Sequence, residues 1–70
     1  MSQLLYYNYA LIDPETRMCI EVTSSSAEQD VSDTLIELPV NDPEYLFKYY
    51  IDGEWYEDAE GTIPWTSSLL

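Results

Sequence analysis

The sequence predicts an all-β fold, a small antiparallel sheet built from two β-hairpins and an edge strand, with room for one short helical turn. Two turn signals carry this prediction: Asp52-Gly53 lies between aromatic runs, and Asp13-Pro14 separates two apolar runs. An Asp-Gly pair between β-forming residues is the strongest short hairpin signal, because a type I′ turn needs positive φ at both central positions. The aromatic content of 14 % is also typical of a folded chain, since disordered chains are poor in aromatic residues.

The first hairpin is expected from strands at residues 4–12 and 17–22. The run LLYYNYALI is apolar on both faces, which favours a central strand. The sequence DPET follows it, and Asp at the first position with Pro at the second fits a type I turn. In RMCIEV the side chains alternate, so Ile20 and Val22 are expected on one face and Cys19 on the other.

A polar loop and an edge strand are expected next. Residues 23–33 show no apolar period and predict a loop, with one helical turn after Ser26. Residues 34–40 form a short β-prone run. Pro39 cannot donate a ladder hydrogen bond, so this strand belongs at a sheet edge or ends there.

The second hairpin is expected from strands at residues 45–51 and 54–58, on either side of the Asp-Gly turn. Aromatic pairs across such a hairpin contribute about 0.2–1 kcal/mol each. Counting outward from the turn predicts four cross-strand pairs: Ile51 with Glu54, Tyr50 with Trp55, Tyr49 with Tyr56, and Lys48 with Glu57.

The C-terminal tail, residues 59–70, has no clear element. It still carries apolar side chains, namely Ile63, Trp65, Leu69 and Leu70. We expect the tail to fold back onto the sheet or to insert into a neighbouring molecule.

The length of 70 residues predicts a single small domain, residues 1–70. Such a chain buries only about 60 % of its unfolded surface, and natural domains of this size often add a disulfide, a metal or a second subunit. Cys19 is the only cysteine and histidine is absent, which excludes an internal disulfide and the usual zinc site. A homo-oligomer, a larger assembly and a self-sufficient monomer all stay open.

The net charge of −12 comes from 14 acidic residues against Arg17 and Lys48. Such a surface repels nucleic acid and anionic lipid, so we expect neither direct nucleic-acid binding nor a membrane partner. The charge either keeps the protein soluble or attracts a basic protein. The sequence shows no signal-peptide pattern and no run approaching the ~20 apolar residues of a membrane span.

The sequence predicts no enzyme activity, no catalytic residue, no cofactor and no metal site. Without histidine, a serine or Cys19 lacks the usual activating base. Cys19 alternates with apolar neighbours, which is typical of a structural thiol. Residues 58–62 (DAEGT) resemble a calcium loop only faintly, because the alternating ligand pattern is missing.

Aromatic side chains concentrated around the second hairpin are the first candidate site. Tyr and Trp are preferred anchors of protein interfaces, yet they are equally typical of a small core. Both interpretations stay open, because one face of a sheet can be core while the other is an interface. The candidate residues for binding a protein partner are Tyr49, Tyr50, Trp55, Tyr56 and Trp65.

An acidic run in the same region is the second candidate site. It indicates either a solvated rim or a mimic of nucleic-acid phosphates that would block a basic groove. The residues of this acidic face are Asp52, Glu54, Glu57, Asp58 and Glu60.

The order of these motifs resembles small phage and prophage proteins of Gram-positive bacteria, especially streptococci and their relatives. In that family an aromatic strand runs into "iDp.t..ci.v", a polar loop follows, and the end reads "d..l.gKyY.dGkW.e". The resemblance covers about residues 4–58, and it departs at Phe47, where the family often has glycine. The matching residues are Tyr9, Ile12, Asp13, Pro14, Cys19, Ile20, Val22, Asp42, Lys48, Tyr50, Asp52, Gly53 and Trp55.

The resemblance implies a non-enzymatic, tail-associated or tail-accessory protein, located in the virion or in the host cytoplasm during infection. It supplies no catalytic residue. The expected mechanism is docking of the aromatic face onto a phage tail protein. The alternative is an acidic phage inhibitor of a host defence or nucleic-acid enzyme, acting like an anti-CRISPR protein by DNA mimicry or by plugging a pocket. A third hypothesis is sugar binding at the host surface through exposed rings.

Overall fold

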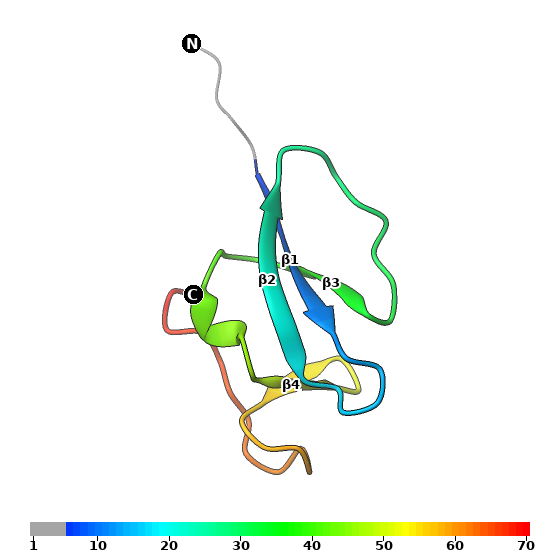
Figure 1. The fold of residues 1–70 in the computed structure, drawn as a ribbon. Helices are drawn as coiled ribbons and strands as arrows, with labels where there is room; N and C mark the ends of the chain where they lie inside the picture. The colour runs from blue at the N-terminus through cyan, green and yellow to red at the C-terminus, as the bar shows by residue number, and fades with distance from the viewer. Residues whose placement is uncertain (1–5) are drawn as a thin grey trace.

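The computed structural model describes residues 6–70, in which the strands form two antiparallel sheets (Figure 1). The first sheet has the order β2-β1-β3, and the second pairs β4 with β5. The predicted all-β class, with two hairpins and an edge strand, is confirmed, although the strands divide between two sheets. The elements are β1 (Tyr7–Ile12), β2 (Cys19–Ser25), β3 (Leu35–Leu38), the 3-10 helix η1 (Pro43–Tyr45), β4 (Tyr49–Ile51) and β5 (Glu54–Tyr56).

β1 is the central strand of the first sheet, as its two apolar faces predicted. Tyr9 and Ala10 are both fully buried. Since successive side chains of a strand point to opposite faces, both faces of β1 are covered. The predicted strand began at residue 4, and residues 4 and 5 lie outside the described residues.

A β-bulge interrupts the predicted alternation of side chains in β2. Leu11 pairs with Glu21 and Ile12 pairs with Cys19, so Ile20 has no partner on β1. The extra residue changes which side chains face inward. Cys19 is buried and Val22 rests against the core, whereas Ile20 is 46 % exposed. The prediction that Ile20 and Val22 share a face is therefore wrong.

The first turn is longer than the predicted type I turn. The carbonyl of Asp13 accepts a hydrogen bond from the N–H of Arg17 at 2.7 Å, and Arg17 has a φ of 67°. The second strand consequently begins at Cys19 instead of residue 17. At its other end it continues through Ser25, into the segment predicted as a loop.

β3 forms an edge of the first sheet, as predicted, but it spans Leu35–Leu38 and not residues 34–40, because Pro39 has no N–H to donate. The helical turn expected after Ser26 is absent from that part of the described chain. The 3-10 helix η1 lies instead at Pro43–Tyr45. The Asp42 carboxylate caps it by accepting from the N–H of Glu44 at 2.9 Å, and Pro43 is suited to the first helical position.

The second hairpin is shorter than predicted, but its register is confirmed. Residues 45–48 are not a strand, because η1 and the positive φ of 73° at Phe47 bend the chain before β4 begins. Asp52 and Gly53 have φ of 52° and 83°, which are both positive as a type I′ turn requires. The pairs are Tyr49 with Tyr56, Tyr50 with Trp55, and Ile51 with Glu54.

The predicted Lys48–Glu57 pair does not form. Lys48 lies outside β4, and its Nζ is 5.0 Å from the ring centroid of Trp65. The cation is therefore directed to an aromatic ring of the C-terminal tail. This is a cation–π arrangement in place of a cross-strand ion pair.

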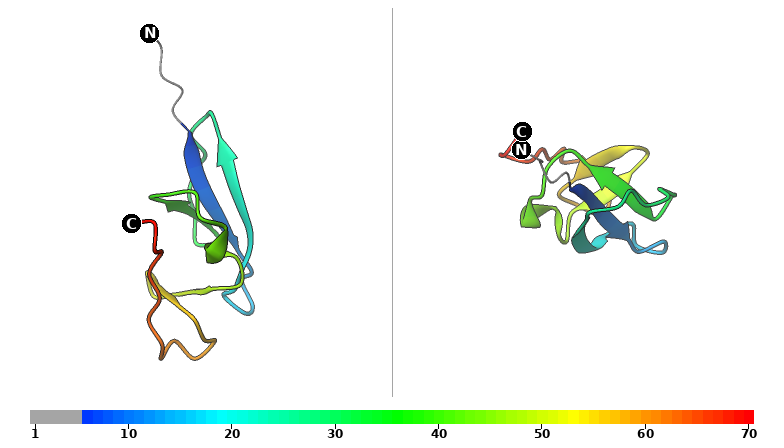
Figure 2. Two further views of the ribbon diagram at one scale, coloured as in Figure 1. Left: turned by 90° about the vertical axis from the view of Figure 1, so that its left-hand side faces the viewer. Right: turned by 90° about the horizontal axis from the view of Figure 1, so that it is seen from above.

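The start of β2 connects the two sheets. The N–H of Cys19 donates to the carbonyl of Lys48 at 2.7 Å, and the N–H of Phe47 donates to the carbonyl of Cys19 at 2.9 Å. Met18 forms an isolated bridge with Tyr49. The β4–β5 hairpin thereby lies at one end of the long β1–β2 hairpin (Figures 1 and 2).

The C-terminal tail folds back beside the second hairpin, as expected (Figure 2). The N–H of Trp65 donates to the carbonyl of Trp55 at 3.0 Å, and Pro64 bridges to Tyr56. Leu69 and Leu70, in contrast, are 60 % and 66 % exposed. Within residues 6–70, no helix has the length and apolar character needed to cross a bilayer.

Candidate functional site

The aromatic rings around the second hairpin form one connected cluster. Tyr45 is only 2 % exposed and lies between Trp55 and Trp65, with centroid distances of 4.9 Å to both rings and edge-on geometry. Tyr50 adds a tilted contact to Trp55 at 5.0 Å. We call these four residues the aromatic cluster. Edge-on pairs of this kind contribute about 0.5–1.5 kcal/mol each beyond the area that they bury.

Tyr45 was missing from the predicted site. The sequence placed it on the incoming strand of the second hairpin, on the same face as Tyr49. A signal was present in the sequence NDPEY, since Asp followed by Pro marks the start of a helical turn. That turn carries Tyr45 inward, where it becomes the centre of the cluster.

Half-buried Trp55 and Trp65 also line an open pocket of about 330 Å³. We call this pocket the aromatic groove. Its rim carries the exposed carboxylate of Glu54. Its main walls are the side chains of Pro39, Tyr45, Trp55, Pro64, Trp65 and Leu70.

The five predicted docking residues do not form one face. Only Trp55 and Trp65 line the aromatic groove. Tyr50 lines a different pocket, described below, and Tyr49 and Tyr56 are half-buried cross-strand partners that line neither pocket. The structure therefore divides the set between two pockets and one cross-strand pair.

A buried polar contact fixes one wall of the groove. The hydroxyl of Ser67 donates to the carboxylate of Asp42, and both residues are 3 % exposed. Asp42 also caps η1, so one side chain links the helix that carries Tyr45 to the C-terminal tail. Burial, and secondly the nearby charge of Asp42, raise the pKa of the Tyr45 hydroxyl.

The acidic face is also divided. Asp58 organises the loop that follows β5, because its carboxylate accepts from the N–H groups of Thr62 and Ile63, each at 2.9 Å, and from the Thr62 hydroxyl. The Thr62 hydroxyl first, and then the Ile63 N–H, lower the pKa of Asp58. The other four predicted acidic residues are exposed: Asp52, Glu54, Glu57 and Glu60.

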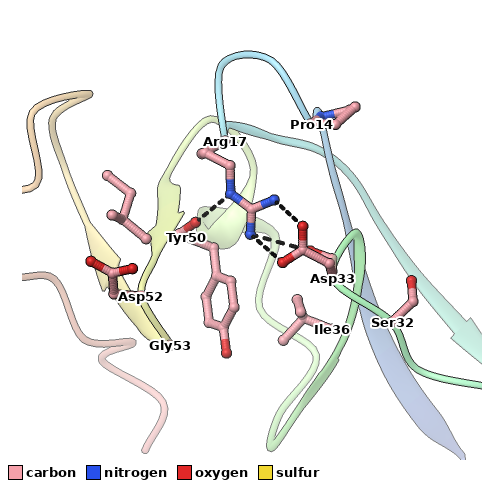
Figure 3. A pocket seen from close by; sticks show the side chains of 9 residues that line it. Pro14, Arg17, Ser32, Asp33, Ile36, Tyr50, Asp52 and Gly53 are labelled. Carbon is pink, nitrogen blue, oxygen red and sulfur yellow. Dashed lines mark hydrogen bonds and ion pairs between the residues drawn. The ribbon is translucent and has the colours of Figure 1, made fainter.

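Figure 3 shows a second pocket, of about 550 Å³, in which Arg17 is held by hydrogen bonds on several sides. Its Nε donates to the carbonyl of Tyr50 at 3.1 Å, and a terminal nitrogen contacts the Asp33 carboxylate at 3.1 Å. Arg17 thus connects the first turn, the second hairpin and the loop before β3. Since Lys48 lies over Trp65, both basic side chains of the sequence are engaged internally.

Cys19 is fully buried at the junction of the two sheets. Burial raises the pKa of the thiol, and the backbone of Glu21 opposes this more weakly. A raised pKa favours the unreactive thiol form. Among residues 6–70, no three potential ligand side chains of His, Cys, Asp or Glu are grouped to hold a metal ion.

Comparisons with protein families, with curated proteins and with solved structures returned no match. The groove offers tryptophan and proline surfaces beside an exposed carboxylate. Groups of this kind can bury apolar surface of a ligand and attract a cation at its edge.

Proposed function

We propose that this chain is a non-enzymatic phage protein, tail-associated or tail-accessory, that docks onto a protein partner through the aromatic groove. The observation that carries the proposal is the pair of half-buried tryptophans in a groove with a carboxylate at its rim. Tryptophan is among the residues most enriched at the energetic centres of protein interfaces. A partner segment with apolar side chains and a basic group would match both parts of the groove.

The groove is well suited to binding because it is already formed. The buried ring of Tyr45 supports Trp55 and Trp65 from below, and the Ser67–Asp42 contact holds the tail in place. Rigid side chains lose little conformational freedom when a partner binds. More of the contact energy then remains available as affinity.

The backbone at Phe47 supports the resemblance to phage proteins. Its φ of 73° lies in the left-handed region that favours glycine. The resembled proteins often have glycine at this position. This chain therefore makes, with a phenylalanine, a bend that glycine would adopt at no steric cost.

The test uses phage particles that carry a tagged copy of the chain, purified and analysed by mass spectrometry. Leu70→Asp changes an exposed residue of the groove, and Leu69→Asp changes its exposed neighbour, which does not line the groove. We expect the native chain and Leu69→Asp in the particles, and Leu70→Asp to be depleted. Absence of the native chain from particles would contradict the tail association.

The second candidate function is an acidic inhibitor of a host defence or nucleic-acid enzyme. The observation that favours it is the exposure of Asp52, Glu54, Glu57 and Glu60, while both basic side chains are engaged internally. A charge decoy should lose its partner as salt rises to about 1 M, where the Debye length falls to roughly 3 Å. Docking through the aromatic groove should change little over the same range.

Salt-resistant binding that Leu70→Asp abolishes would favour the docking function. Salt-sensitive binding that is weakened by neutralising Glu57 and Glu60 together would favour the inhibitor. Sedimentation at several concentrations tests the homo-oligomer. The net charge of −12 opposes self-association, so we expect dimers to require high salt if they form.

A further inference from the structure

A third pocket, of about 430 Å³, lies at the end of the first sheet that is remote from the second hairpin. β1 begins there and β2 ends there, as Figure 1 shows. The pocket shares no residue with the aromatic groove. It is lined by Tyr6, Asn8, Ser24 and Asn41.

Strand pairing brings three polar side chains of this pocket together. Asn8 and Ser24 are cross-strand partners on β1 and β2, so their side chains share one face. The Ser24 hydroxyl donates to Oδ1 of Asn8 at 2.8 Å. Nδ2 of Asn41, from the segment after β3, donates to Oγ of Ser24 at 2.6 Å.

These two hydrogen bonds orient both amides and use only one polar atom of each. Within residues 6–70, Nδ2 of Asn8 and Oδ1 of Asn41 take no part in any hydrogen bond. An amide nitrogen offers two donors and an amide oxygen offers two acceptor sites. The pocket therefore presents a donor and an acceptor at positions fixed through the same hydroxyl.

Tyr6 supplies an aromatic surface beside these amides. It is 59 % exposed and lies two residues before Asn8, on the same side of an extended chain. An exposed tyrosine ring combines a flat apolar face with a polar tip. A ligand that matches both the ring and the amides needs a flat apolar face with hydroxyl groups at its edge.

We propose that this pocket binds a neutral saccharide. The Tyr6 ring stacks on the C–H face of the sugar. Nδ2 of Asn8 donates to one sugar hydroxyl, and Oδ1 of Asn41 accepts from another. This site is separate from the docking groove, and the inference does not depend on the proposed function.

The charge distribution selects a neutral sugar over an anionic one. The lining of this pocket carries no charged side chain, whereas Glu54 lines the aromatic groove and Arg17 lines the pocket of Figure 3. A net charge of −12 repels uronic acids and phosphate-bearing polymers. No cation in the lining offsets that repulsion.

The test is saturation-transfer difference NMR on the full chain with glucose, galactose, rhamnose and N-acetylglucosamine. Glucuronic acid serves as the charged counterpart of glucose. We expect at least one neutral sugar to bind with a dissociation constant of about 1 mM, because a monosaccharide offers few atoms for contact. Glucuronic acid should bind more weakly than glucose. No binding of any neutral sugar would overturn the proposal.

Variants locate the bound sugar. Tyr6→Ala should weaken binding about tenfold with an unchanged circular dichroism spectrum, whereas Tyr6→Phe, which keeps the ring face, should retain it. Asn8→Asp removes the donor and should also weaken binding. Phe47→Ala is the matched control, because Phe47 is 63 % exposed and lies outside the pocket.

An unchanged affinity of Tyr6→Ala for the sugar, or an equal loss of affinity in Phe47→Ala, would contradict the placement of the sugar in this pocket. The docking variant Leu70→Asp should bind the sugar normally. Failure of virion association and failure of sugar binding are therefore distinguishable.

Discussion

In the first sheet, β1 is hydrogen-bonded along both edges and buries Tyr9, Ala10 and Ile12. In the second sheet, β4 and β5 are only three residues long each, and their side chains are half-buried or exposed. An isolated two-stranded hairpin is marginally stable at best in water. The second hairpin depends instead on contacts beyond its own two strands, namely backbone hydrogen bonds to the start of β2 and to the tail, and aromatic side-chain contacts. The difference is that a continuous hydrogen-bonded ladder holds the first half of this molecule, whereas scattered backbone bonds to other segments and aromatic and polar side-chain contacts hold the second.

The aromatic cluster should give the largest effect. Tyr45→Ala removes the ring between Trp55 and Trp65 and should lower the free energy of unfolding by about 3–5 kcal/mol. Urea unfolding, followed by tryptophan fluorescence and by circular dichroism, measures it. Phe47→Ala is the control, because an exposed ring should cost only about 0.5 kcal/mol or less.

Coincidence of the two urea transitions would show that the halves unfold together. If fluorescence changed first in Tyr45→Ala, the second hairpin would be an independently unfolding unit. That result would contradict the expectation that both halves unfold as one cooperative unit around a shared core.

The buried Asp42–Ser67 contact should give the next effect. Asp42→Ala removes both the cap of η1 and the acceptor for Ser67, and it should cost about 1–3 kcal/mol. Ser67→Ala removes only the second contact and should cost less. A double-mutant cycle measures their coupling by thermal unfolding, and additive effects would show that the tail is not anchored through this pair.

Backbone strain at Phe47 should give a smaller effect of opposite sign. With a φ of 73°, glycine avoids the left-handed penalty that alanine keeps. Phe47→Gly should therefore be more stable than Phe47→Ala by about 1 kcal/mol, the lower end of that penalty. Both variants lose the same ring. The difference between their free energies of unfolding, measured by chemical denaturation, therefore reports the backbone strain at this position. A more stable alanine variant would contradict the bend at this position.

The loop after β5 should give the smallest and most local effect. The pKa of Asp58 is lowered below its ordinary value of 3.8, mainly by the Thr62 hydroxyl and the Ile63 N–H. The charged form is thus favoured in the folded chain, so its stabilisation is complete above about pH 3.8 and is lost as pH falls through the lower folded value. The amide N–H groups of Thr62 and Ile63 should exchange faster with solvent below that pH.

In Asp58→Asn, the amide N–H groups of Thr62 and Ile63 should exchange fast at every pH. In Asp52→Asn, which changes the exposed turn, they should exchange as in the native chain. Nuclear magnetic resonance of the two amides measures this. Protection of Thr62 and Ile63 that is independent of pH in the native chain would show that the carboxylate does not hold the loop.

The candidate site was predicted in part. Trp55 and Trp65 were identified because two tryptophans near a hairpin are a strong compositional signal, and both line the aromatic groove. Tyr45 was missed, because its role comes from the turn at Pro43–Tyr45 and not from the alternation of its neighbours. The saccharide pocket could not be predicted, since its amides are adjacent only through the pairing of separate segments.

The sequence by itself determined the features that depend on neighbouring residues. The Asp52-Gly53 turn determined the register of the second hairpin, because few other residues tolerate two successive positive φ angles. Pro39 determined where β3 ends, because proline has no N–H to donate.

Only the tertiary structure decided the features that depend on distant segments. It decided that Ile20 bulges out of β2, that Tyr45 turns inward and that Lys48 covers Trp65. Each of these follows from competition for burial between parts of the chain that are far apart in sequence. Local periodicity carries no information about that competition, because the partner of a side chain is set by how the whole chain folds.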